Sequence, residues 1–142
     1  MTADNSLQRF LTAQETDYAL ALAEVKAGRK RSHWMWCIFP QIQGLGFSET
    51  SKLYAIKDRQ EAGDYLKHPV LGGRLISIGQ ELLKLDSSDA TRIFGSPDDL
   101  KLKSSMTLFA AVGSNPVFQA VLDRFFRGAP DNQTLQLLGK QL

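Results

Sequence analysis

The stretch SPDDLKLKSSMTLFAAVGSNPVFQAVLDRFFRG, residues 96–128, encodes two successive helices, each opened by a polar residue followed by proline. Ser96 and Asn115 are of the type that caps the free N–H groups of a helix start, and proline is tolerated in the first turn. Two aspartates follow the first proline and suit the positive end of the helix dipole. The stretch therefore predicts two amphipathic helices. Their apolar residues recur at helical spacing, at Leu102, Met106 and Phe109 and then at Val117, Val121 and Phe125.

Similar start signals occur along the rest of the chain, as capping boxes, single caps and first-turn prolines. Gly72, Gly73 and Gly79 lie inside a predicted helix after residue 69 and indicate close approach of neighbouring helices. No segment shows sustained alternation of β-branched residues, so strands are not expected. The sequence predicts an all-α, compact multi-helical single domain (residues 1–142) of about seven to eight short helices, with residues 1–6 as a flexible N-terminus. The further predicted starts are Thr12 with Glu15, Ser32, Ser48, Asp58 with Glu61, Pro69 and Asp131.

Composition limits the classes of function. The 142 residues are 43% hydrophobic and 23% charged, as in an ordinary globular domain. A net charge of +2 is too small to indicate nucleic-acid binding, which needs a concentrated basic surface. The single cysteine, Cys37, excludes an internal disulfide and a cysteine-based zinc site, and its apolar neighbours predict a buried thiol. The lack of a long apolar run or a signal-peptide core predicts a cytoplasmic protein with no membrane association.

The segment GRKRSHWMWCIFPQIQGLG, residues 28–46, is the first candidate site. It places three cations before a predicted helix start, where backbone N–H groups favour an anion. A tryptophan there offers a stacking surface for a planar base, and the histidine titrates in the range used for proton transfer. The alternative is that the tryptophans are core residues, the cations are solvated and the histidine is structural. The candidate residues are Arg31, Trp34, Trp36 and Gln41 for binding and His33 for catalysis.

Residues 98–110 form a second candidate site, because two adjacent hydroxyls lie beside two lysines on a predicted helix. Such a group suits a phosphate or a hydroxylated ligand. The alternative is that the serines simply allow helices to pack closely. Glu49 is a further candidate, either as a general acid or base or as a partner of the helix dipole. The candidate binding residues of the second site are Lys101, Lys103, Ser104 and Ser105.

The chain carries no Walker loop, dinucleotide fingerprint, HExxH motif or cysteine–histidine metal spacing. Neither a cofactor nor a metal site is therefore expected. The leading hypothesis is a site for an anionic, nucleotide-like small molecule, formed where the segment 29–41 and the segment 101–105 meet. The alternative is a non-catalytic protein-interaction module with an unknown protein partner. Binding of nucleic acid is the least favoured, because acidic residues are interspersed with the basic ones.

The motif of residues 28–46 resembles the signature of a mainly bacterial family, domain of unknown function 1810, sometimes mislabelled calpastatin. The resemblance covers nearly the whole chain from Leu7 and implies a compact, mostly helical fold without an established activity. It continues through YAI, EAGDYLKHPVLGGRL, IFGSPDDLKLKSSMTLFAA and VFQAVLDRFFRGAPDNQTLQLL.

The order of predicted helices is also distantly similar to that of the NADAR family. Members of that family act on N-glycosidic bonds of nucleotide-derived substrates and carry a serine–glutamate–histidine motif near a helix start. Ser48 and Glu49 match this motif, whereas Thr50 replaces the histidine. If the site is catalytic, the likeness implies hydrolysis of an N-glycosidic bond. The sequence leaves open whether the protein is an enzyme.

Overall fold

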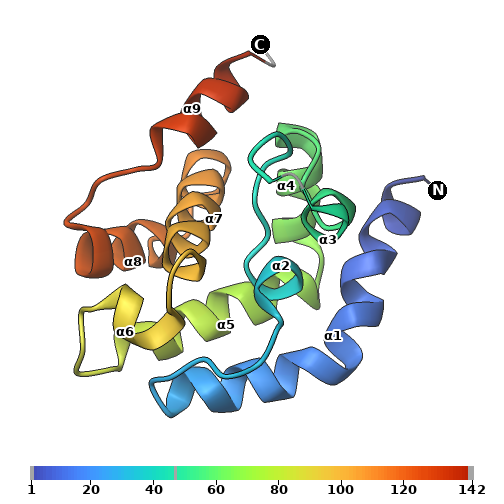
Figure 1. The fold of residues 1–142 in the computed structure, drawn as a ribbon. Helices are drawn as coiled ribbons and strands as arrows, with labels where there is room; N and C mark the ends of the chain where they lie inside the picture. The colour runs from blue at the N-terminus through green and yellow to red at the C-terminus, as the bar shows by residue number, and fades with distance from the viewer. Residues whose placement is uncertain (1, 47, 141–142) are drawn as a thin grey trace.

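Nine helices make up the part of the chain that the structure, a computed structural model, describes (Figure 1). That part is residues 2–46 and 48–140, with side chains described from Leu7 onward. In these ranges the β pairing is limited to one isolated parallel bridge, between Ile42 and Ile56. The all-α single-domain fold is confirmed, with nine helices rather than seven to eight. The helices are α1 (Thr2–Lys26), α2 (Met35–Ile38), α3 (Glu49–Leu53), α4 (Arg59–Lys67), α5 (Leu71–Leu83), α6 (Ala90–Phe94), α7 (Asp98–Val112), α8 (Val117–Phe126) and α9 (Asn132–Gly139).

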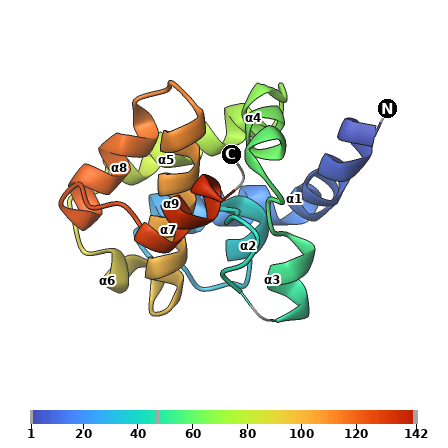
Figure 2. The same cartoon turned by 90° about the horizontal axis from the view of Figure 1, so that it is seen from above.

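α7 is the central helix of the fold. It packs against α4, α6, α8 and α9, while α5 packs against α1, α4 and α8. Figure 2 shows α9 lying close to α7 and α3 at the edge of the molecule. Consecutive residues 104–109 of α7 are all buried, as expected for a helix surrounded by its neighbours. The first turns of α7 are more exposed, and they face the candidate site.

The predicted apolar faces of α7 and α8 form the core. Leu102, Met106 and Phe109 of α7 are fully buried. The Phe109 ring lies 5.4 Å from that of Tyr65 in α4 and 5.8 Å from that of Phe118 in α8, measured between centroids. Burial of a large apolar side chain stabilises a fold by about 1.5–3 kcal/mol. This row of rings therefore joins three helices at the centre of the domain.

Several predicted helix starts are confirmed by their hydrogen bonds. The side chains of Ser48, Asp58 and Asp131 each accept from the backbone N–H three residues later, at 3.1, 2.9 and 3.1 Å. These contacts satisfy N–H groups that a helix start otherwise leaves unpaired. Asn115 accepts from the N–H of Val117 at 2.9 Å, but the N-cap position of α8 is held by Pro116, so Asn115, the predicted cap, lies one residue before the actual one.

Four predicted starts are wrong. α1 extends on both sides of Thr12, so the capping-box spacing there lies inside a helix. Ser32 caps no helix, because its hydroxyl donates to Glu24 on α1 at 2.6 Å. Pro69 lies in the turn between α4 and α5 rather than in a first helical turn. Ser96 does not cap α7, since the N-cap position is held by the proline that follows it.

Close helix approach at a glycine is found where α4 meets α5. A Cβ placed on Gly72 would lie 2.0 Å from the carbonyl oxygen of Leu66, so any larger residue there would collide with backbone. At Gly79 the nearest atom to such a Cβ is a methyl carbon of Val117, at 3.1 Å. The absence of a side chain at Gly72 and Gly79 lets α5 pack directly against α4 and α8. The close approach expected at Gly73 is wrong, because no atom lies within 4 Å of a Cβ placed there.

Two further expectations concern the ends of the chain and the membrane. Residues 1–6 have no described side chains, and the flexible N-terminus stays a prediction. Across the described residues, no helix combines the length and the apolar character needed to cross a bilayer.

Candidate functional site

A surface cleft of about 420 Å³ lies between α2, the connector that follows it, α7 and the start of α9. This volume falls in the range of small-molecule sites. We call it the Trp36 cleft. It brings together predicted residues from two distant segments of the chain. Its lining residues are Trp36, Gln41, Leu45, Gly46, Ser48, Ser51, Pro97, Leu100, Lys101, Lys103, Ser104, Asp131 and Gln133.

The connector after α2 forms one wall of the cleft. Ile56 donates its N–H to the carbonyl oxygen of Gln41 at 2.8 Å, and Gln43 donates to the carbonyl oxygen of Ile56 at 2.7 Å. These bonds hold the connector against the segment that follows α3. A Cβ on Gly46 would lie 2.4 Å from the hydroxyl oxygen of Ser51, so a side chain there would force Ser51 to move. The wall is thus shaped by backbone pairing and by one glycine.

The first two turns of α7 form the opposite wall. Positions 97, 100, 101 and 104 follow the spacing of one helix face, and all four line the cleft. Lys103 flanks this face and lines the cleft as well. Leu102 and Met106 lie on the other side of the helix and are fully buried. The polar and apolar residues of this segment are therefore sorted by helical periodicity.

Lys101 lies between a carboxylate and an aromatic ring. Its ammonium is 3.1 Å from Asp98 and 4.5 Å from the centroid of the Trp36 ring. Asp98 also pairs with Lys30 at 2.9 Å. Burial alone would raise the pKa of Asp98, but hydrogen bonds from the two lysines outweigh it and lower that pKa below its ordinary value. One carboxylate shared by two lysines leaves net positive charge beside the cleft.

Lys103 is the least neutralised cation of the cleft. No carboxylate among the described residues lies within ion-pair distance of its ammonium. Its side chain points towards the Phe126 ring, 6.0 Å from the centroid. A partly buried lysine without a carboxylate partner attracts an anion more strongly than one already in an ion pair.

Asp131 closes the cleft from the α9 side, and its carboxylate is already occupied. It accepts from the hydroxyl of Ser104 at 3.2 Å and from the hydroxyl and N–H of Thr134 at 2.5 and 3.1 Å. Its own N–H donates to Thr107 at 2.9 Å. Asp131 therefore links α7 to α9, and sequence reasoning had found it only as a helix cap. Gln133, also from α9, was missed because an exposed glutamine carries no pattern of its own.

Trp36 presents an indole N–H that has no acceptor. The Nε1 atom is buried, and no described residue accepts a hydrogen bond from it. An unpaired buried donor costs about 1–3 kcal/mol. Trp36 also borders a smaller recess of about 20 Å³, which leads off the cleft past Gln41 and Gly46. A ligand acceptor atom that reached this N–H would remove the cost.

Other predicted residues lie outside the cleft. Trp34 is in the core, where its ring lies 6.2 Å from that of Phe39. Ser105 is fully buried on the core side of α7, and its hydroxyl has no partner among the described residues. Arg31 and His33 are exposed in the loop before α2 and line none of the clefts we describe. The two tryptophans therefore have different environments, although only one residue separates them.

Glu49 lies near the edge of the cleft without lining it. It is exposed in the first turn of α3, directly after Ser48, which does line the cleft. No histidine is adjacent to it in the chain, because Thr50 follows.

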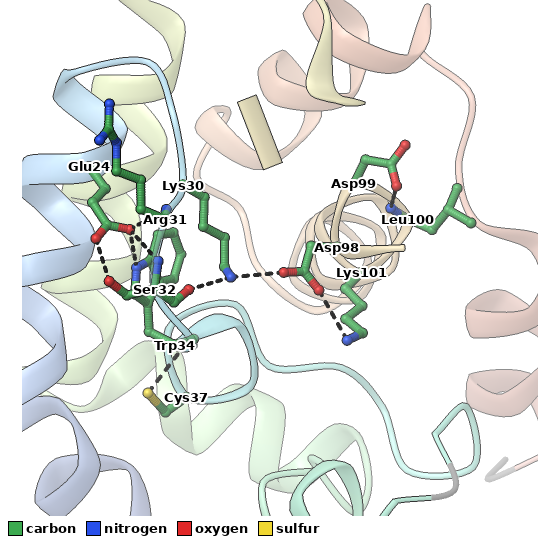
Figure 3. A network of polar contacts seen from close by, with 10 residues as sticks. All are labelled: Glu24, Lys30, Arg31, Ser32, Trp34, Cys37, Asp98, Asp99, Leu100 and Lys101. Atoms are coloured by element: carbon green, nitrogen blue, oxygen red, sulfur yellow. Dashed lines mark hydrogen bonds and ion pairs between the residues drawn. The ribbon is translucent and has the colours of Figure 1, made fainter. Parts of the chain in front are cut away.

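Glu24 organises the loop between α1 and α2, and sequence reasoning missed it (Figure 3). Its carboxylate accepts from the N–H groups of Arg31 and Ser32 at 2.7 and 3.0 Å, from the Ser32 hydroxyl at 2.6 Å and from Nε1 of Trp34 at 2.9 Å. Burial acts to raise the pKa of Glu24, but these hydrogen bonds lower it to about 2. The exposed cations of the loop are thus held in place by backbone contacts rather than by their charges.

The same figure shows how this loop is tied to the cleft. Lys30 donates to the carbonyl oxygen of Ser32 and reaches across to Asp98, which in turn contacts Lys101. Charged contacts therefore run from the loop after α1 to the wall of the Trp36 cleft.

Cys37 belongs to the structure and not to the cleft. It is buried on α2, as predicted. Burial and the nearby Asp17 carboxylate raise the pKa of its thiol to about 12. A thiol in this environment stays protonated and unreactive near neutral pH.

Comparison with known proteins identifies the family. Residues 4–138 match the family described as "Protein of unknown function (DUF1810)". The chain belongs to the DUF1810 family. Its structure resembles the crystal structure of the conserved hypothetical protein Rv1873 from Mycobacterium tuberculosis, with a TM-score of 0.92 and 44% sequence identity. That match covers 94% of this chain and 96% of the other. Among curated proteins, none matches the sequence.

Membership of the DUF1810 family confirms the family inferred from the motif of residues 28–46. The distant likeness to the NADAR family stays a hypothesis. In the described part of the chain, no group of three or more histidine, cysteine, aspartate or glutamate side chains is placed to hold a metal ion.

Proposed function

We propose that the Trp36 cleft binds an anionic, nucleotide-like small molecule. The observation that carries the proposal is the meeting of two segments about sixty residues apart in the chain. Trp36 and Gln41 come from one segment, and Lys101, Lys103 and Ser104 come from the other. Polar groups that converge beside an aromatic ring fix the orientation of a bound small molecule.

Each group has a distinct role in this proposal. Lys103 meets the anionic group, because it has no carboxylate to neutralise it. The Nε1 atom of Trp36 donates to an acceptor atom of the ligand, which satisfies a donor that is otherwise unpaired. Gln41 and Gln133 supply amide donors and acceptors to hydroxyl groups of a sugar.

The face of the Trp36 ring is shared with Lys101. Its ammonium lies 4.5 Å from the ring centroid, so a planar base stacks there only after the ammonium has moved. An anion in the cleft attracts the same ammonium and draws it off the ring. Binding of the charged group and stacking of the base therefore support each other.

A hydrolytic activity is a second candidate function, on the likeness to the NADAR family. Glu49 is the carboxylate that we favour for acid–base chemistry, since its neighbour Ser48 lines the cleft. His33 is exposed and lines none of the clefts described, so a role for it requires the loop before α2 to move. Assaying nucleotides for release of a free base with Glu49→Gln and His33→Ala tests both residues separately.

Binding is tested first by thermal denaturation with AMP, ATP, NAD, ADP-ribose and ribose 5-phosphate. A ligand present at a hundred times its Kd stabilises the fold by about 2.7 kcal/mol, because it binds only the folded state. At roughly 3 °C per kcal/mol for a chain of this length, Tm rises by about 8 °C.

Lys103→Met locates the site, since methionine keeps most of the apolar stem and removes the charge. We expect this variant to lose the ligand-induced rise in Tm and to keep the Tm of the ligand-free protein. Lys26→Met, at the exposed end of α1, is the matched control and retains the full rise. No rise with any compound at millimolar concentration refutes the proposal.

A further inference from the structure

A second cleft adjoins the Trp36 cleft across α7. It has a volume of about 480 Å³ and lies between α6, α7 and the end of α8. Leu100 and Lys103 line both clefts, so these two side chains separate one cleft from the other. We call it the Arg127 cleft. A ligand group placed at Lys103 can extend into either cleft.

The Arg127 cleft is rich in cations and aromatic rings. Lys103, Arg124 and Arg127 line it together with Phe125 and Phe126. The guanidinium of Arg124 donates to the carbonyl oxygen of Leu85, which fixes its position and leaves further N–H groups free. No described residue accepts a hydrogen bond from the side chain of Arg127. Arg124 is therefore held in place with donors to spare, and the donors of Arg127 are unoccupied among the described residues.

The two carboxylates of the Arg127 cleft offset only part of the positive charge of these cations. Asp99 accepts from the hydroxyl of Thr91 at 2.6 Å and from the N–H of Leu100 at 2.9 Å. Asp89 caps α6 by accepting from the N–H of Arg92 at 3.1 Å. Both carboxylates are committed to local hydrogen bonds, and the three cations of the lining outnumber them.

The backbone at Arg127 supports a role for its side chain. Among the described residues, Arg127 is the one non-glycine residue with a positive φ, at 56°. This left-handed conformation ends α8 and normally favours glycine or asparagine. An arginine there is held at a cost of about 1 kcal/mol or more. We therefore attribute the arginine at this position to a contact of its side chain rather than to the turn itself.

We infer that the two clefts form one elongated site, in which a ligand with a chain of phosphates places its nucleoside in the Trp36 cleft and its terminal phosphate at Arg124 and Arg127. Lys103 contacts the phosphates between them. This inference rests on the proposed function and narrows it to the class of nucleoside polyphosphates and related elongated anions. It assigns no reaction to the site.

The test compares AMP and ATP, without divalent cations and at constant ionic strength, by isothermal titration calorimetry. We expect ATP to bind wild-type protein at least about tenfold more tightly than AMP, as the gain of one charge-assisted hydrogen bond implies. Arg127→Gly removes the guanidinium and keeps the fold, because glycine adopts the left-handed conformation without steric cost. In this variant, ATP and AMP should bind with similar affinity, and the affinity for AMP should equal that of wild type.

Two controls separate this effect from a general loss of charge. Arg127→Lys keeps a cation in the same backbone conformation and should retain most of the preference for ATP. Arg29→Ala removes an exposed cation that lines neither cleft and should change nothing. If Arg127→Gly binds ATP as tightly as wild type, the elongated site is refuted while the Trp36 cleft stands. If wild-type protein binds neither nucleotide, the proposed function itself fails, and this inference fails with it.

Discussion

Replacing Glu24 by glutamine tests whether its carboxylate holds the loop between α1 and α2. Three of its four hydrogen bonds end on Oε1, which an amide oxygen can replace. The fourth ends on Oε2, where the amide nitrogen would meet the hydroxyl of Ser32, and that hydroxyl can turn to accept. Glu24→Gln therefore keeps the shape and the partners and removes only the negative charge.

The expected loss follows from the number of bonds. A hydrogen bond to a charged group contributes about 1.5–3 kcal/mol, against about 0.5–1.5 kcal/mol for a neutral one. The two ranges differ by about 1 kcal/mol for each bond, but four bonds to one carboxylate are not additive. At roughly half of that difference for each bond, Glu24→Gln should lower the free energy of unfolding by about 2 kcal/mol at neutral pH. Glu24→Ala should lower the free energy of unfolding by more than this, because alanine also leaves the indole N–H of Trp34 without an acceptor.

The effect should depend on pH with a definite sign. The pKa of Glu24 falls from 4.5 to about 2 on folding, so its contribution is fully present above the unfolded value. It is lost as the pH falls through that value towards 2. Urea denaturation should thus give a difference in unfolding free energy between wild type and Glu24→Gln that is constant above pH 5 and becomes smaller below it.

Glu15→Gln is the matched control, because Glu15 is exposed on the same helix. It should change stability by less than about 0.5 kcal/mol at any pH in the series. A Glu24→Gln protein as stable as wild type at pH 7, or a gap that does not narrow in acid, would show that the carboxylate does not hold the loop.

Further predictions concern packing and the thiol. Gly72→Ala should destabilise the fold by about 3 kcal/mol or more, since its Cβ would lie 2.0 Å from the Leu66 carbonyl oxygen. Gly73→Ala should stabilise the fold by up to about 1 kcal/mol, because no atom lies within 4 Å of its Cβ and alanine favours a helix. Thermal denaturation measures the change in Tm of each variant, and equal changes for the two would refute the close approach of α4 and α5. Cys37 should resist iodoacetamide at pH 8 in the native protein and react once the chain is unfolded in urea, because burial raises its pKa to about 12. Rapid labelling of the folded protein, followed by mass spectrometry, would contradict its buried position.

The α7–α8 pair could be predicted from the sequence because periodicity and caps agree there. Leu102, Met106 and Phe109 recur at helical spacing, and their burial follows from that spacing alone. The capping box at Thr12 misled for the opposite reason. A serine or threonine three residues before a glutamate also occurs inside helices, and nothing local marked the earlier start of α1. Ser32 failed as a cap because a distant carboxylate, Glu24, competes for its hydroxyl.

Part of the candidate site could be inferred from the sequence in the same way. A stacking surface after three cations marked Trp36, two adjacent hydroxyls beside two lysines marked Lys101, and the fold places both residues in one cleft. Helical spacing predicts that the two tryptophans point to different sides, because residues two apart do so on a helix. It does not decide which of them faces outward. Only the packing of the loop on Glu24 places Trp34 in the core. Gln133 entered the cleft through the tertiary position of α9, which no local pattern indicates.

The two ends of α7 differ in how freely they can change. Its first turns expose Leu100, Lys101 and Lys103 to the clefts, while residues 104–109 are buried without interruption. Substitutions at exposed positions usually alter stability by less than about 0.5 kcal/mol. Leu100 is exposed and Lys101 and Lys103 are partly exposed. Mutations at these three positions can therefore alter the lining of the clefts while the buried turns keep the helix in place. A library of variants at positions 100, 101 and 103 would explore new specificities with little risk to folding.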